Sequence, residues 1–181
     1  MPVSLLRVRM RPQPHRRAAH SGWDSESSTF ICTVQPLVPV EPTPPALVAR
    51  INESLHIKPR EFRVVLGDID ILLDEDRQPK SIEVYTNPAQ WKICAIVNGP
   101  TAGEDEKLDL EVDYDKNNIA SIDVPVSIEH DSIRKKLLFR FGSTVNTWHR
   151  LANGLLIGLD RESGLAAILC ERVDMQNNPL V

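Results

Sequence analysis

The sequence predicts a mainly β protein, and three observations support this fold class. From Arg60 onward, apolar and polar residues alternate with a period of two, as in strands that bury one face. Glycine, asparagine and aspartate separate the short apolar runs at regular intervals, as turns between strands require. The 181 residues include 14 prolines, against roughly 9 expected at the usual frequency, and proline disfavours helices because it lacks a backbone donor.

Residues 1–28 are basic and then rich in serine, without hydrophobic periodicity. Five arginines and no acidic residue lie within residues 1–20, and three prolines would interrupt any amphipathic helix there. This pattern predicts a disordered basic leader. We expect a single β-rich domain over residues 29–181, which begins with a strand at 29–34 and a proline-rich extended path after it.

One N-terminal helix is predicted, at about residues 44–56. Thr43 can cap its first turn, and Pro44 suits that turn because the N–H it lacks would have no partner within the helix. Apolar residues then recur at helical spacing until Pro59 ends the helix.

The candidate strands after residue 60 are short and separated by turn residues. They lie at residues 62–66, 69–73, 81–86, 91–97, 108–114, 120–126, 136–141, 155–159 and 166–173. Strands of this number and length fit an antiparallel meander, a barrel or a sandwich.

A polar turn led by aspartate, with a strand on either side, recurs along the chain. The hairpin units lie near residues 69–84, 108–124 and 155–169, and their turns begin near Asp76, Asp115 and Asp160. The repetition indicates either a duplicated hairpin unit or one favourable turn chemistry that recurs in unrelated hairpins.

The C-terminal part contains the strand Leu137-Leu-Phe-Arg-Phe-Gly142 and a later hairpin with glycine and aspartate in its turn. Residues 137–173 resemble a short bacterial β-hairpin domain family of unknown function. In that family, a strand of the type L-x-I-x-L precedes a D-G-V-x-V-D-x-D-x-x-G-x-V-x-G-I-E-I hairpin. The chain departs from the family at Ala167, where the family has glycine. The resemblance implies a small β-sheet module and no established chemistry. It rests on Asn153, Gly154, Asp160, Gly164 and Ile168.

No metal and no cofactor are predicted. Cys32, Cys94 and Cys170 are odd in number and far apart, which signals neither a disulfide framework nor a thiolate metal site, and we expect them to pack as small apolar side chains. The histidines lack metal-binding spacing. The turn at residues 113–117 departs from a calcium loop where glycine and a bidentate glutamate are needed.

No catalytic residue is predicted either. Nucleophile motifs, phosphate-binding glycine loops and paired glycosidase carboxylates are missing from the sequence. His130 lies between two carboxylates and His149 beside a tryptophan, and we expect both to be polar loop histidines. The sequence therefore leans away from an enzyme.

The distribution of charge leads to the functional hypothesis. The chain totals −4, and because residues 1–20 contribute +5, the remainder carries −9. An acidic body disfavours nucleic-acid binding and favours a protein partner with a basic surface. The candidate partner-binding residues lie in two acidic turns: Asp74, Glu75, Asp76, Asp113, Asp115 and Asn117.

We therefore predict a non-enzymatic binding or accessory protein that engages a macromolecular partner through an acidic surface. Two alternatives stay open: a small-ligand β-barrel that acts on an apolar ligand as a cyclase or isomerase, and a structural or assembly subunit that forms homo-oligomers through strand edges. The longest apolar run, residues 165–170, is too short to span a membrane, and no secretory signal is recognised. We expect a soluble, cytoplasmic protein.

Overall fold

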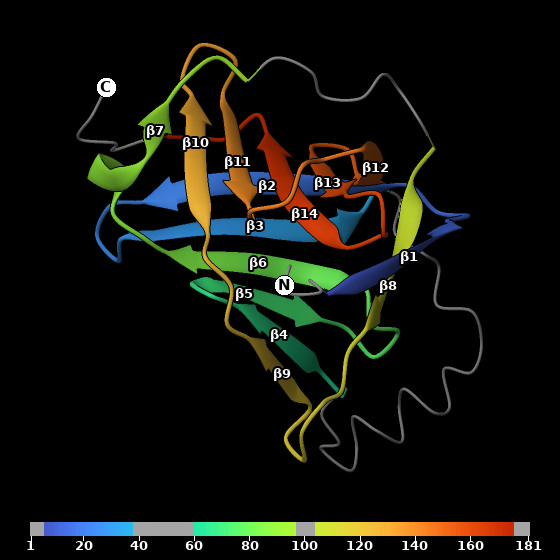
Figure 1. Cartoon of the computed structure of the whole chain (residues 1–181). Helices are drawn as coiled ribbons and strands as arrows, with labels where there is room; N and C mark the ends of the chain where they lie inside the picture. The colour runs from blue at the N-terminus through green and yellow to red at the C-terminus, as the bar shows by residue number, and fades with distance from the viewer. Residues whose placement is uncertain (1–5, 38–59, 97–103, 176–181) are drawn as a thin grey trace, which may run out of the picture.

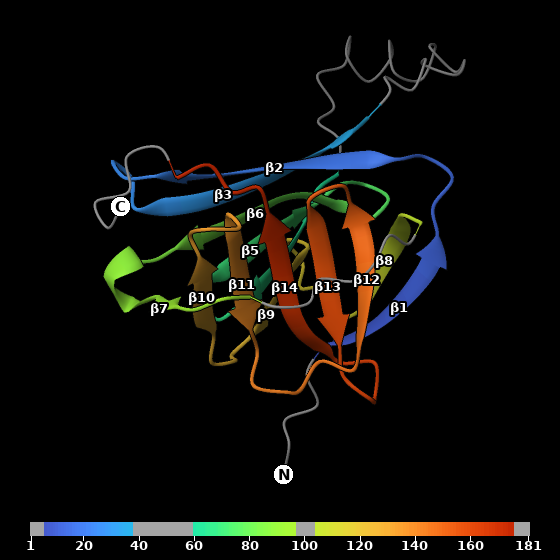
Figure 2. The same cartoon turned by 90° about the horizontal axis from the view of Figure 1, so that it is seen from above.

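The computed structural model describes residues 6–37, 60–96 and 104–175, and it confirms a mainly β fold. Two six-stranded sheets lie against each other, and a two-stranded ribbon lies beside them (Figures 1 and 2). The helix expected at 44–56 falls outside the described residues, so nothing in the structure supports it. In the described ranges the one helical element is a 3-10 turn, Pro88–Gln90. No helix in these ranges has the length and apolar character needed to cross a membrane.

Sheet I has the strand order β2-β3-β6-β5-β4-β9. Its neighbouring strands are antiparallel, except that β4 and β9 run parallel. The strands are β2 (Arg17–Asp24), β3 (Thr29–Pro36), β4 (Phe62–Leu66), β5 (Ile69–Leu73), β6 (Pro79–Tyr85) and β9 (Ile119–Ile122).

Sheet II has the strand order β12-β13-β14-β11-β10-β7. Its neighbours are also antiparallel, except for the parallel pair β10 and β7. The strands are β7 (Lys92–Ile93), β10 (Ser127–Asp131), β11 (Lys136–Arg140), β12 (Thr147–Ala152), β13 (Leu155–Leu159) and β14 (Leu165–Glu171).

The two sheets form a sandwich whose strands cross steeply, as Figure 1 shows for the upright β10 and β11 over the transverse β3 and β6. The inward faces share one apolar core, in which Phe30 of β3 meets Phe139 of β11 with ring centroids 5.4 Å apart. Of the predicted architectures, the structure shows the sandwich. Within the described residues the sheets do not close into a barrel, so the prediction of a barrel is wrong.

The strands β11, β13 and β14 are apolar on both faces. A second cluster, formed by Leu138, Leu156, Ala167, Leu169 and Ile96, covers the outer side of sheet II. Burial on both faces explains why these strands read as continuous apolar runs instead of alternating ones.

The prediction of a disordered leader is wrong for residues 6–28, because the strands β1 (Arg7–Pro12) and β2 lie there. Leu6, Val8 and Met10 alternate with arginines, and Leu6 and Val8 are buried while the arginines face solvent. This is the period of two expected of a strand. Because every second residue of this strand is an arginine, the segment resembles a charged tail in composition.

Strand β1 pairs antiparallel with β8 (Glu106–Glu111), and the two form the β1–β8 ribbon. Arg9 and Arg11 of β1 form ion pairs with Glu111 and Asp109 of β8, at 2.6 and 2.7 Å. Basic residues of the predicted leader are therefore neutralised by acids of the domain, as a paired strand allows and a free tail does not.

Strands β10 and β12 lie outside the strands predicted from the sequence. Strand β10 is polar at every position except Ile128, yet its His130 and Asp131 are almost fully buried. Strand β12 mixes polar, charged and apolar residues without alternation. Both strands are defined by their neighbours in sheet II and not by their own hydrophobic pattern.

Candidate functional site

The two acidic turns predicted as a partner-binding surface lie together in the structure. Asp74, Glu75 and Asp76 begin the turn between β5 and β6, and residues 113–117 follow β8. We call these residues the acidic face: Asp74, Glu75, Asp76, Asp113, Asp115 and Asn117. Segments that are about forty residues apart in the chain thus form one surface.

Arg77 joins the two turns. Its guanidinium carbon lies 5.3 Å from the centroid of the Tyr114 ring and 5.0 Å from that of Phe62. The Tyr114 and Phe62 rings are themselves 5.0 Å apart in an edge-to-face arrangement. Because Arg77 follows Asp76 directly and Tyr114 lies between Asp113 and Asp115, this cation–π stack sets the two turns next to each other.

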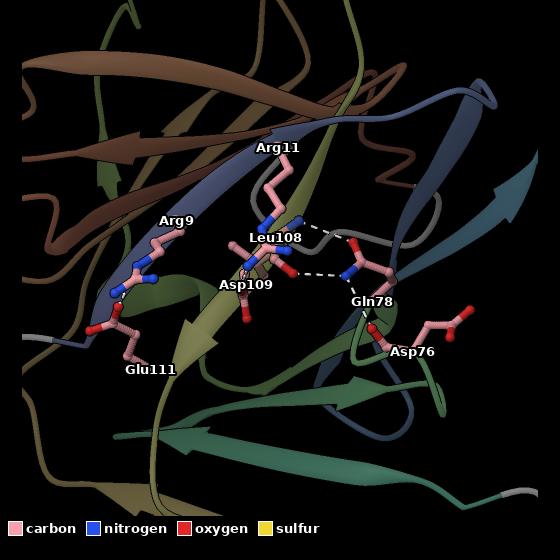
Figure 3. A network of polar contacts seen from close by, with 7 residues as sticks. All are labelled: Arg9, Arg11, Asp76, Gln78, Leu108, Asp109 and Glu111. Carbon is pink, nitrogen blue, oxygen red and sulfur yellow. Dashed lines mark hydrogen bonds and ion pairs between the residues drawn. The ribbon is translucent and has the colours of Figure 1, made fainter.

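A buried glutamine makes the second connection. The Gln78 side chain donates from Nε2 to Leu108 O at 2.8 Å and accepts at Oε1 from Leu108 N at 3.0 Å (Figure 3). Nε2 also contacts Asp76 O at 3.3 Å. The turn between β5 and β6 is therefore bound to the backbone of β8, which leads into the second acidic turn.

Two of the predicted partner-binding carboxylates accept hydrogen bonds from backbone N–H groups of their own turns. Oδ1 of Asp74 accepts from Gln78 N, and Oδ1 of Asp115 accepts from Ile119 N, both at 2.8 Å. Asp160 makes the same contact with Gly164 N at 2.8 Å. In each turn the residue three positions after the aspartate has a positive φ, namely 57° at Arg77, 62° at Asn118 and 62° at Ser163.

These shared contacts correct the prediction of three repeated hairpin units. The first turn begins at Asp74 and not near Asp76. The first and third units are hairpins, since β5 pairs with β6 and β13 with β14. The second unit is not, because β8 pairs with β1 while β9 pairs with β4. A common five-residue turn recurs in all three, and it suits aspartate because its carboxylate accepts backbone N–H groups.

Glu75, Asp76 and Asp113 differ from the two turn-forming aspartates. They are exposed, and within the described residues their carboxylates make no hydrogen bond or ion pair. Three nearby cations, Arg60, Arg77 and Lys116, partly offset them, and Lys116 lies within the second turn itself. Arg60 binds Asn118 Oδ1 at 2.7 Å and lies 5.0 Å from the centroid of the Phe62 ring. The sequence could have indicated these cations, because basic residues lie close to the predicted acidic turns.

A cleft of about 880 Å³ lies elsewhere, between the β9–β10 connection, the β11–β12 loop and the β13–β14 turn. Its walls come from separate loops, so no local pattern in the sequence predicts it. Phe141 and Val145 supply apolar lining, and Asp123, Arg7 and Arg161 supply charge. Among the described residues, neither arginine forms an ion pair.

The two histidines considered for acid–base work lie on strands, so their assignment to loops is wrong. His130 is buried against the Trp91 ring, 5.7 Å between centroids, and burial lowers its pKa. His149 contacts Glu106 Oε2 at 2.8 Å through Nδ1 and Thr147 Oγ1 at 3.1 Å through Nε2.

The contact order Thr147, His149, Glu106 is that of a hydrolytic triad. However, none of the three residues lines the cleft described above. A triad also needs donors for the developing oxyanion and a place for substrate. Asn146, directly before Thr147, lines the cleft, but Thr147 itself does not, and we assign no catalysis to this contact.

No cluster of three or more histidine, cysteine, aspartate or glutamate side chains suited to a metal occurs among the described residues. Oδ1 of Asp115, the centre of the turn that most resembles a calcium loop, already accepts from Asn117 N and Ile119 N. The expectation that the protein needs no metal remains a prediction, tested below.

Comparison with protein-family models found no match to this chain, and a search of curated proteins found none either. The resemblance of residues 137–173 to the bacterial hairpin family stays a prediction. In the structure, the hairpin of that segment consists of β13 and β14.

Proposed function

We propose that this protein is a non-enzymatic binding protein that engages a protein partner with a basic surface through the acidic face. The observation that carries the proposal is the stack of Arg77 on Tyr114, which brings two acidic turns together. Glu75, Asp76 and Asp113 project from this frame without internal partners among the described residues. Their charge is free to interact with another molecule.

The frame around these carboxylates is rigid for physical reasons. Buried Gln78 binds both polar backbone groups of Leu108, and the turn aspartates hold the backbone of each turn. A preorganised surface loses less conformational entropy on binding than a mobile one. Exposed charges at such a surface mainly accelerate association and select partners of opposite sign.

The small-ligand alternative has one supporting observation, the 880 Å³ cleft, on whose wall Arg7 and Arg161 form no ion pair with another described residue. A barrel interior is not its site, because the space between the sheets is filled by side chains such as Phe30, Phe139 and Phe141. The cleft also carries acidic residues, which oppose a simple anion site. We therefore rank it second.

The experiment compares two double charge reversals. Glu75→Lys with Asp76→Lys changes the acidic face, whereas Glu26→Lys with Asp68→Lys changes two exposed acids in other turns by the same total charge. Partners captured from native extract by the wild type are identified and purified, and association and release rates are measured at several salt concentrations. We expect the first variant to slow association by roughly tenfold at low salt, with little effect on release.

Three results would contradict the proposal. Equal effects of both double variants would show that net charge acts and not the acidic face. Association that does not depend on salt would exclude electrostatic steering. Recovery of a small molecule and no protein would favour the cleft instead, and a concentration-dependent homo-oligomer without other partners would favour the assembly subunit.

A further inference from the structure

A pocket of about 480 Å³ lies at one end of the sandwich, between the β2–β3 turn and the loop that follows β6. Figure 1 shows these two segments at the same end of the molecule, next to the 3-10 turn η1. Thr86 N donates to Ser28 O at 3.1 Å, and Thr29 and Tyr85 are ladder partners, so the segments are joined directly. The pocket shares no residue with the acidic face or with the 880 Å³ cleft.

None of the described residues that line this pocket is charged. In the 880 Å³ cleft, by contrast, the lining includes arginines and carboxylates, and 25% of the whole chain is charged. Asp24, just before the β2–β3 turn, uses its carboxylate within that turn, where it accepts from Glu26 N at 2.9 Å and from Ser27 Oγ at 2.7 Å. A charged ligand would therefore lose water in this pocket without gaining an opposite charge from its lining.

The polar side chains of the pocket have hydrogen-bonding capacity that the described residues do not use. The side chains of Ser25, Ser28 and Gln90 make no hydrogen bond with another described residue. Asn87 accepts at Oδ1 from Ala89 N at 3.0 Å, and its Nδ2 donates to no described residue. Hydroxyl and amide groups both donate and accept. Together they suit a neutral ligand that carries several hydroxyl groups.

Two aromatic residues complete the chemistry of the pocket. Tyr85 is 74% exposed, whereas Trp23 is only 6% exposed. The face of an aromatic ring is electron-rich. The C–H groups on one face of a pyranose ring carry a slight positive charge, so a sugar stacks on such a ring. An exposed tyrosine beside unused hydroxyl and amide groups is thus the combination that a sugar requires.

The pocket is held in shape by contacts that leave these polar groups unused. The Trp91 ring meets the Trp23 ring edge to face, with centroids 5.1 Å apart, and its Nε1 donates to Thr86 Oγ1 at 3.2 Å. Pro88 is buried at the start of η1, which Asn87 caps. A preorganised site loses less conformational entropy on binding than a mobile one.

We propose that this pocket binds a neutral saccharide, with a pyranose ring stacked on Tyr85 and hydroxyl groups hydrogen-bonded to Ser25, Ser28, Asn87 and Gln90. The volume lies within the range of small-ligand sites. One stacked ring and a few hydrogen bonds exposed to water give weak binding, so we expect a millimolar dissociation constant for a single sugar unit. An aromatic heterocycle would also stack on Tyr85, but it would leave most of these polar side chains without a partner.

The test titrates the isotope-labelled full chain with neutral probes and follows its NMR spectrum. The probes are the methyl glycosides of glucose, galactose, mannose and N-acetylglucosamine. Methyl glucuronide is the charged comparison, and indole is the aromatic comparison without hydroxyl groups. We expect saturable shifts with at least one neutral glycoside in the backbone amides of residues 25–28 and 85–90 and in the indole N–H of Trp23. Both comparison compounds should bind more weakly than that glycoside.

Variants of the exposed tyrosine separate stacking from other causes. Tyr85→Ala should weaken binding of that glycoside about five- to tenfold, whereas Tyr85→Phe should keep most of the affinity because stacking uses the ring. Gln90→Ala should weaken binding several-fold, through a lost hydrogen bond. Ile93→Ala is the matched control, since it removes a 68% exposed apolar side chain that does not line the pocket, and it should bind like the wild type.

The proposal would be overturned if no neutral glycoside caused a saturable shift at tens of millimolar, or if the shifts centred outside the pocket. Tighter binding of indole or of methyl glucuronide would overturn it too, as would unchanged binding by Tyr85→Ala. Should a Tyr85 variant fail to fold, the location of the shifts in the wild type still decides the matter. None of these outcomes affects the charge-reversal test of the acidic face, which uses other residues.

Discussion

The Gln78 side chain binds both backbone polar groups of Leu108, at 2.8 Å to its oxygen and 3.0 Å to its nitrogen. Strand β1 occupies the other side of β8, where Met10 is the ladder partner of Leu108. Gln78 therefore takes the place of a neighbouring strand at this position. One side chain completes the hydrogen bonding of β8 and docks the first acidic turn onto it.

Replacing Gln78 by Leu should lower the free energy of unfolding by about 2 kcal/mol or more, because a buried N–H and a buried carbonyl lose their partners. Urea denaturation measures the change. Gln90→Leu, at an exposed position, is the control and should change stability little. An equal effect of the two variants would show that the Gln78 contacts contribute nothing to folding.

The first strand should be required for stability, in contrast to a disordered leader. Deleting residues 1–12 removes buried Leu6 and Val8 and exposes the edge of β8, so we expect a large drop in melting temperature or loss of folding. Val8→Ala should cost about 2 kcal/mol. Arg9→Ala should cost less than about 1 kcal/mol because its ion pair is exposed and screened. A deletion that leaves the melting temperature unchanged would disprove the role of β1.

Gly67 and Gly142 both have positive φ values, 57° and 89°, but differ in their surroundings. A Cβ at Gly67 would lie 2.5 Å from Val124 O, a backbone atom, whereas a Cβ at Gly142 would have no neighbour within 4 Å. Gly142→Ala should cost about 1 kcal/mol through backbone strain alone. Gly67→Ala should cost about 3 kcal/mol, since strain and collision add. Thermal denaturation of the two variants checks the order.

Stability should fall as the pH drops below about 6.5, the pKa of a histidine in the unfolded chain. Burial lowers the pKa of His130 in the folded state, so at mildly acidic pH the unfolded chain binds a proton that the folded protein resists. His130→Phe should flatten the decrease in urea midpoint from pH 7 to pH 5. A decrease identical to that of the wild type would exclude His130 as its source.

Asp131 should act in a separate, more acidic range. Backbone N–H groups of Arg134 and Ile96, together with the Arg134 guanidinium, hold the pKa of Asp131 at about 2. Its contribution to stability is therefore present above the unfolded-state pKa of about 4 and is lost as the pH falls toward 2. Asp131→Asn should remove that part of the acid transition. Because the Asp131 charge raises the pKa of His130, the decrease between pH 7 and pH 5 should persist in this variant and should not become smaller.

Metal ions should not stabilise the protein. After treatment with a chelator, added calcium, magnesium or zinc should leave the melting temperature unchanged, because the Asp115 carboxylate is engaged by backbone N–H groups. A shift that grows with calcium concentration would show binding. Asp113→Asn would then be the first variant to examine.

Local pattern predicted the elements whose structure depends on nearby residues. The β4–β5 hairpin was predicted with its observed bounds, because alternation and the Gly67-Asp68 turn lie within a few residues of each other. The aspartate-led turns were also evident in the sequence, since their carboxylates bind N–H groups two to four residues onward. In the same way the sequence located each acidic turn of the candidate site.

Long-range pairing decided the rest. Arg11 meets Asp109 across 98 residues, so composition alone made β1 look like a charged tail. Strand β10 is polar and acquires its place from β11 and β7. That Arg77 would stack on Tyr114 follows from the packing of separate strands. The sequence by itself determined the β class and the turns, because period and turn chemistry act locally; the sandwich and the sites it assembles depend on contacts between distant segments, which only the tertiary structure decided.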